Sequence, residues 1–266
     1  MLLLGAEVFR RYVGPELAPA MARTLRLGAL LGALLLVTVS VADTTWTVTQ
    51  LLGRFDGAFI LEYFWRTHHG RATLVRLSLV AVVLVLNLQP PKSMAWLSAP
   101  LGLGVLATFS FLSHAAAMHG RPALVADLAH FTAATLWGGA VLYTALSPRW
   151  KNEPANAALT KTIARVSSLG LWCVLLLTAT GVYASVLHLT RPAELTTTPY
   201  GLVLVLKLAL VGTILAIAGF NRWWLLPALE RGKTRRLGQM LRLEAALLIT
   251  VFAATGILTT RPLPHG

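Results

Sequence analysis

The sequence has little charge. Charged residues make up 12% of its 266 residues, whereas a soluble domain carries about 25%. Hydrophobic residues make up 56% and form long blocks, and the block 166–190 contains no Asp, Glu, Lys or Arg. Since about 20 mostly apolar residues can cross a bilayer as a helix, the composition argues against a soluble domain. It favours an all-α, polytopic membrane protein surrounded by lipid.

Cysteine and acidic residues are also scarce. The single cysteine, Cys173, lies in an apolar block, which excludes a disulfide framework and a thiolate metal cluster. Ten acidic residues against 23 Lys and Arg give a net charge of +13. Membrane proteins collect Lys and Arg in cytoplasmic loops, so we expect no nucleic-acid partner. The chain also lacks a glycine-rich phosphate loop, and we expect neither an ATP-driven pump nor an enzyme.

The apolar blocks predict about eight transmembrane helices, the first of them short, in one membrane domain over 1–266. The predicted segments are 1–13, 24–46, 72–90, 93–117, 122–147, 162–188, 199–226 and 238–260. One side of this arrangement has fifteen Lys or Arg and the other has seven, with Lys207 inside a span. Because Lys and Arg favour the cytoplasm, the first side is predicted to be cytoplasmic and both termini periplasmic.

All seven histidines fall in the predicted outer half or the outer loops. They are His68, His69, His114, His119, His130, His188 and His265. Histidines that merely sit at membrane interfaces would show no such bias. The one-sided distribution therefore favours a site that faces the periplasm.

The segment 120–122, Gly-Arg-Pro, predicts a tight break between two antiparallel helices. His114 and Met118 are four residues apart, and Asp127 and His130 are three apart, so each pair shares a helix face. At 1.5 Å per residue, His114 and Asp127 both lie about 10 Å below the break. If the two faces meet, they form a pocket that contains imidazole, thioether and carboxylate groups.

Ionisable groups inside a bilayer usually mark a site or a pathway. Imidazole with thioether suits copper, especially Cu(I), although zinc also accepts imidazole. The candidate metal ligands are His114, Met118, His119, His130, His68 and His69. Asp127 is expected to orient a histidine rather than to bind the ion. The alternative for each histidine is a hydrogen-bonded residue at the interface.

Other features predict structural roles. Lys207 needs an acidic partner inside its span, with Asp127 or Glu244 as candidates. Trp137 is followed by two glycines, which permit close helix contact. Two short matches, 67–76 with 198–207 and 2–9 with 135–143, have an offset of about 132 residues. They favour two four-helix repeats in the same orientation, 1–120 and 121–266.

Five ordered motifs resemble a known family. They are SHAAA (113–117), DLAHFTAATLWGGAVL (127–142), TPYGLVLVLKLAL (198–210), GFNRWWLLPAL (219–229) and RLEAALLITVFAATGILTTRPLP (242–264). The sequence resembles the copper resistance protein D (CopD) family of bacterial inner-membrane proteins. The resemblance implies eight helices, copper handling and a periplasmic partner of the CopC type. It also implies that His114 and His130 belong to the family's histidine motifs, and Asn221 with Arg222 to its cytoplasmic loop motif.

The leading hypothesis is a copper transporter that moves the ion inward from the periplasm. In this interpretation His68, His69 and His119 collect copper, and His114 with His130 holds it at the entrance of the pathway. No His or Cys cluster marks an inner exit. Two alternatives stay open: a membrane redox protein with b-type haem and axial histidines, and a factor that delivers copper to a partner without transport.

Overall fold

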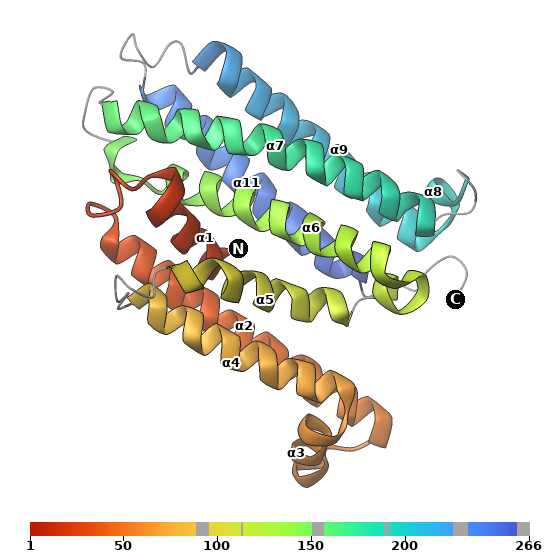
Figure 1. Ribbon diagram of the computed structural model, residues 1–266. Helices are drawn as coiled ribbons and strands as arrows, with labels where there is room; N and C mark the ends of the chain where they lie inside the picture. The colour runs from red at the N-terminus through yellow and green to blue at the C-terminus, as the bar shows by residue number, and fades with distance from the viewer. Residues whose placement is uncertain are drawn as a thin grey trace.

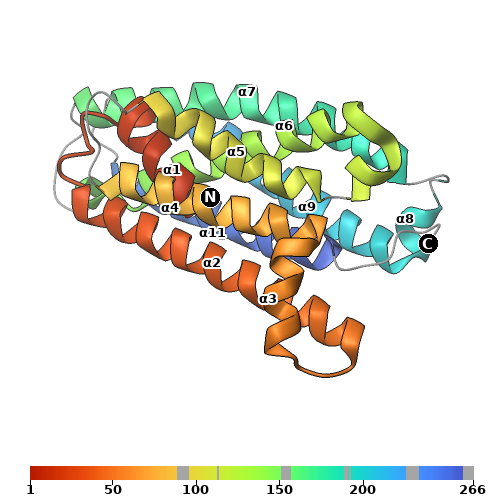
Figure 2. The same ribbon diagram turned by 60° about the horizontal axis from the view of Figure 1, so that its bottom comes forward.

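The computed structural model describes residues 1–88, 96–112, 114–150, 157–188, 191, 193–225 and 234–259. Within these ranges the chain is helical and contains no strand. Eight helices form the bundle: α1 (Leu2–Val8), α2 (Ala22–Leu52), α4 (His68–Leu88), α5 (Ser98–Phe111), α6 (His114–Ala145), α7 (Ala157–His188), α9 (Pro199–Phe220) and α11 (Thr234–Thr259). Figures 1 and 2 show their axes running in roughly the same direction.

Shorter elements connect them. They are α3 (Gly57–Arg66), α8 (Glu194–Thr197), the π-helical turns η1 (Phe9–Val13) and η4 (Asn221–Leu225), and the 3-10 turn η3 (Pro148–Trp150). The segment α3 projects away from one end of the bundle (Figure 1). Each predicted transmembrane segment thus contains helix. The helix α3, which carries several aromatic residues, lies between the predicted segments 24–46 and 72–90.

Among the described helices, six are long and apolar enough to cross a membrane: α2, α4, α6, α7, α9 and α11. Large apolar side chains on their outer faces are exposed, for example Leu34 on α2, Leu175 on α7 and Leu206 on α9. In water such a surface would be unfavourable, whereas a bilayer solvates it. The predicted all-α, multi-pass membrane fold is confirmed.

One predicted span differs in the structure. The segment 93–117 is not a continuous helix, because α5 ends at Phe111 after 14 residues. A new helix begins at His114 and is interrupted at Gly120, where φ is 71° and ψ is −156°. A positive φ favours glycine, so the predicted break at Gly120 is present. The helical segment just before the break begins only at His114, whereas the hydropathy predicted one long antiparallel helix over 93–117.

Close contacts at glycine join the two halves of the bundle. A Cβ atom on Gly5 would lie 2.7 Å from the Cα atom of Gly139, which places α1 directly against α6. Nearby, the rings of Phe9 and Tyr143 are 6.0 Å apart, and the Tyr143 hydroxyl donates a hydrogen bond to the Leu2 carbonyl at 2.9 Å. The close contact predicted at the glycines after Trp137 is therefore present.

The same local structure begins α4 and α9. The Thr67 hydroxyl accepts a hydrogen bond from the Gly70 amide at 2.9 Å, and the Thr198 hydroxyl accepts one from the Gly201 amide at 3.0 Å. A Cβ atom on either glycine would collide with the backbone of the preceding short helix, α3 or α8. These matched caps are what a duplication would produce, and the duplication stays a prediction.

The elements that carry histidine lie at one end of the bundle. Figure 1 shows the junction of α3 and α4, the beginning of α6 and the end of α7 at the same end. His68 and His69 begin α4, His188 ends α7, and His130 lies near the middle of α6; His265 lies outside the described residues. Which membrane face this end meets stays a prediction. Met1 lies within the bundle beside Gly138, so the predicted periplasmic N-terminus gains no support.

Candidate metal centre

His130 is held by a hydrogen bond across the contact of α6 and α7. Its Nδ1 atom lies 2.9 Å from the Thr180 hydroxyl oxygen. That hydroxyl donates its only hydrogen to the Leu176 carbonyl, at 2.7 Å. With that hydrogen directed at the Leu176 carbonyl, the oxygen accepts a hydrogen bond from Nδ1–H, and the lone pair of the neutral imidazole is on Nε2. A histidine in this state is prepared to bind a metal through Nε2.

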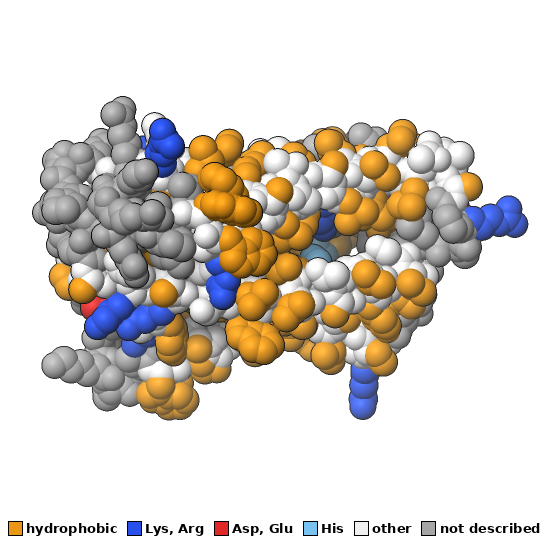
Figure 3. All heavy atoms as spheres, turned by 90° about the horizontal axis from the view of Figure 1, so that it is seen from above, with side chains coloured by type: hydrophobic (Ala, Val, Ile, Leu, Met, Phe, Trp, Pro, Cys, Tyr) orange, Lys and Arg blue, Asp and Glu red, His pale blue; other side chains and the backbone are white. Residues whose placement is uncertain are grey.

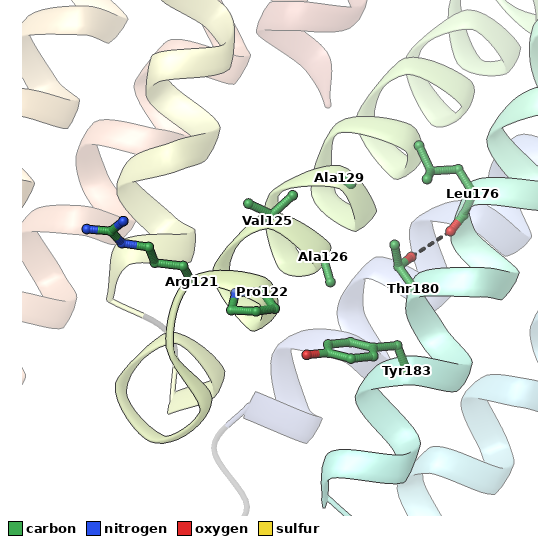
Figure 4. Close-up of a pocket in the computed structure, with 8 residues that line it drawn as sticks. All are labelled: Arg121, Pro122, Val125, Ala126, Ala129, Leu176, Thr180 and Tyr183. Carbon is green, nitrogen blue, oxygen red and sulfur yellow. Dashed lines mark hydrogen bonds between the residues drawn. The ribbon is translucent and has the colours of Figure 1, made fainter.

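A pocket opens beside this pair. It has a volume of about 540 Å³ and is lined by Arg121, Pro122, Val125, Ala126, Ala129, Leu176, Thr180 and Tyr183. Figure 4 shows its wall formed by α6 and α7, with Arg121 pointing away from the other side chains. Because the lining is mainly apolar, the pocket by itself does not supply a set of metal ligands. Thr180 lines the pocket, whereas its partner His130 is not among the lining residues.

Charged side chains accompany His130. Lys207 on α9 is within electrostatic range of both Asp127 and His130 on α6. Of the two partners predicted for Lys207, Asp127 is the one that stabilises its charge. Figure 3 shows a hollow in the face above α7 and α9, with a histidine and a basic side chain visible inside it. Asp127 thus offsets part of the positive charge of Lys207.

The remaining residues of the predicted pocket lie on the segment before Gly120. His114, Met118 and His119 belong to a helical backbone there, but their side chains are outside the described part of the structure. The predicted meeting of His114 and Met118 with Asp127 and His130 thus stays a prediction. Among the side chains that the structure does describe, no three His, Cys, Asp or Glu residues are grouped so that they could hold a metal ion.

His68 and His69 point in different directions, as adjacent residues on a helix do. His68 is exposed. His69 is partly buried, with Nε2 3.5 Å from the Asp43 carboxylate on α2 and its ring 6.0 Å from the ring of Tyr63. The two imidazoles therefore do not form one site together, although each could contact copper separately, and this stays a prediction.

Arg76 lies inside the predicted span 72–90 and is buried within α4, where it is 5% exposed. Its Nε atom donates to the Thr108 hydroxyl at 3.0 Å, and its guanidinium lies 3.7 Å from the centre of the Phe109 ring. In the match of 67–76 with 198–207, Arg76 corresponds to Lys207, which also lies inside a span.

The other predicted structural residues are well packed. Trp137 is buried against Gly170 of α7. Asn221 donates to the Glu244 carboxylate at 3.1 Å, and Arg222 donates to the Ser167 hydroxyl at 2.6 Å. These contacts join the end of α9 to α11 and to α7.

Comparisons with known proteins agree with these features. The family model described as copper resistance protein D-like, N-terminal domain, matches residues 1–124, and the one described as copper resistance protein D matches residues 160–258. The chain belongs to the copper resistance protein D family. No solved structure matches the chain. Thr180, Lys207 and Glu244 lie within the second range that matches the family, and His130 lies between the two ranges.

A curated member of this family provides a further comparison. Copper resistance protein D of Pseudomonas syringae pv. tomato is 29% identical over 197 residues, which are 68% of this chain and 63% of that protein. The chain thus matches somewhat less than two thirds of the length of this relative.

Proposed function

We propose that this chain carries copper across the bacterial cytoplasmic membrane, inward from the periplasm, as part of copper resistance. Membership of the copper resistance protein D family supports the choice of copper. The observation that carries the proposal is the contact of His130 with Thr180, because the tautomer that donates Nδ1–H to this hydroxyl keeps the Nε2 lone pair for a metal. A membrane-embedded imidazole in this state, beside a pocket, is a ligand for an ion in transit rather than a packing residue.

The route begins at the end of the bundle that carries the histidines. His68 is exposed there and can take copper from a periplasmic protein of the CopC type, with His69 next to it in the sequence and His119 just before the break at Gly120. His114 and His130, with Met118, then hold the ion. Imidazole and thioether ligands favour Cu(I). Transport of this kind needs no bond-breaking chemistry, so the protein acts without enzymatic activity.

The experiment is copper uptake by sealed proteoliposomes loaded with the purified protein. Wild-type protein should raise the rate of Cu(I) entry above that of empty liposomes. The double variant His114→Ala, His130→Ala should fall to the rate of empty liposomes, because both imidazoles of the entrance are lost. Gly212→Ala is the control, since a Cβ atom there meets only open space. Wild-type rates in the double variant would contradict the pathway.

A second candidate is delivery of copper to a partner without transport. It is favoured by the inner end of the bundle, where the described residues offer buried carboxylates and amides but no histidine or cysteine to receive Cu(I). In that case the purified protein would bind copper through His130 and release it to the partner. Sealed liposomes that contain the protein would take up no copper. A b-type haem protein, the third hypothesis, would show a Soret absorption band after purification.

A further inference from the structure

Glu244 is a carboxyl group buried in the membrane-spanning part of α11. It is 3% exposed, and its partner is Asn221, which is 7% exposed and begins the π-helical turn η4. The Asn221 Nδ2 atom donates to Glu244 Oε2 at 3.1 Å. The Asn221 Oδ1 atom is buried and has no hydrogen-bond partner in the described structure. The pair therefore has one amide oxygen left over, directly beside a carboxyl group.

Among the side chains that the structure describes, the elements packed around α11 provide no cation that pairs with this carboxyl. In η4, Arg222 is turned to Ser167 on α7. On α9, Lys207 lies 14 residues before Asn221, about 21 Å along the helix, and is near Asp127 instead. On α6, Tyr143 donates to Leu2, and His130 and Asp127 lie near the middle of the helix. Arg242, on α11 itself, is exposed. Within the described residues, no Lys or Arg forms an ion pair with Glu244.

An ionised carboxylate in this position is costly, since a buried charge needs a partner or is neutralised by a proton. A metal ion would require more oxygen atoms, as the six or more ligands of Mg²⁺ and Ca²⁺ show. The amide of Asn221 suits a proton better. It donates Nδ2–H when the carboxylate is ionised, and after a half-turn of the amide Oδ1 accepts the O–H of the protonated acid.

We propose that Glu244 is a proton-binding site that couples copper movement to proton movement, an inference that rests on the proposed transport function. The carboxylate takes up one proton from one side of the membrane and releases it to the other. Helix α9 connects this site to the copper-binding end, because it carries Lys207 in its outer part and leads into Asn221. A π-helical turn at such a place often marks a functional site.

Proton binding is tested first, without reference to transport. Infrared difference spectra of the purified full-length protein should show the C=O stretching band of a protonated carboxyl, titrating with pH. The band should disappear in Glu244→Gln and return in Glu244→Asp. In Asn221→Ala, which loses the hydrogen bond to the ionised form, it should persist to higher pH; this variant keeps the test open if Glu244→Gln does not fold. A band unchanged in both Glu244→Gln and Asn221→Ala overturns the proposal.

Coupling is tested in proteoliposomes that contain a trapped pH indicator. Addition of Cu(I) should change the internal pH with the wild-type protein and with Glu62→Gln, which removes an exposed carboxylate paired with Arg66. Glu244→Gln should abolish the pH change. If Glu244→Gln still admits copper and still shows the wild-type pH change, the coupling is overturned, while the transport function is not. No copper entry with wild-type protein would overturn the transport function, while the infrared band would still report on proton binding.

Discussion

Replacement of Thr180 by valine should weaken copper binding although Thr180 is not itself a ligand. The substitution keeps the shape of the side chain and removes the oxygen that accepts the Nδ1–H of His130, 2.9 Å away. A buried donor without an acceptor costs about 1–3 kcal/mol. Loss of the group that orients a metal-binding histidine typically lowers metal affinity about 10–100-fold. The two figures agree, since a tenfold change corresponds to about 1.4 kcal/mol.

The assay is a competition titration of Cu(I) between the purified protein and a chromogenic chelator. Thr180→Val should lose affinity by about 10–100-fold, and Thr180→Ser should retain it because the hydroxyl is kept. The matched control is Thr213→Val on α9, where an exposed hydroxyl also donates to the carbonyl four residues earlier, Ala209, at 2.9 Å, but contacts no histidine. Equal affinities for Thr180→Val and Thr213→Val would refute the role of Thr180.

Two further predictions concern stability. Gly139→Ala should destabilise the protein by about 1–3 kcal/mol through overpacking, because the new Cβ atom would lie 2.5 Å from the Gly5 Cα atom; thermal unfolding in detergent measures this, and a loss no larger than that of Gly212→Ala would contradict it. Hydrogen bonds from Arg165 lower the pKa of the exposed Glu16 from its ordinary 4.5. The ionised form is thus favoured by folding, so the stability difference between wild type and Glu16→Gln should be full at neutral pH and vanish as the pH falls below the lowered pKa. A difference that grows in acid would contradict that assignment.

The sequence was sufficient for the fold because the bilayer imposes a simple rule. Apolar blocks of about 20 residues must be helices when lipid surrounds them, and the long blocks appear as α2, α4, α6, α7, α9 and α11. Hydropathy could not show that the block 93–117 is interrupted after Phe111. No charge or proline marks that end in the sequence.

The candidate site was predicted only in part. The three-residue spacing of Asp127 and His130 placed them on one helix face. The free-energy cost of a charge inside the bilayer indicated that Lys207 has an acidic partner. Spacing could not identify Thr180, because a threonine among many in an apolar helix has no distinguishing pattern; its role depends on how α6 and α7 pack. Arg76 lay inside the predicted span 72–90, but the sequence could not show which groups its charge contacts, because its hydrogen bond to Thr108 depends on how α4 and α5 pack.

The most direct measurement is X-ray absorption at the copper K-edge of the purified protein loaded with one equivalent of Cu(I), compared with its His130→Ala variant. If Nε2 of His130 binds the ion, the wild-type spectrum should contain the scattering pattern of imidazole, and that contribution should decrease in the variant. Identical spectra, at equal copper content, would contradict the central claim that this imidazole is a copper ligand.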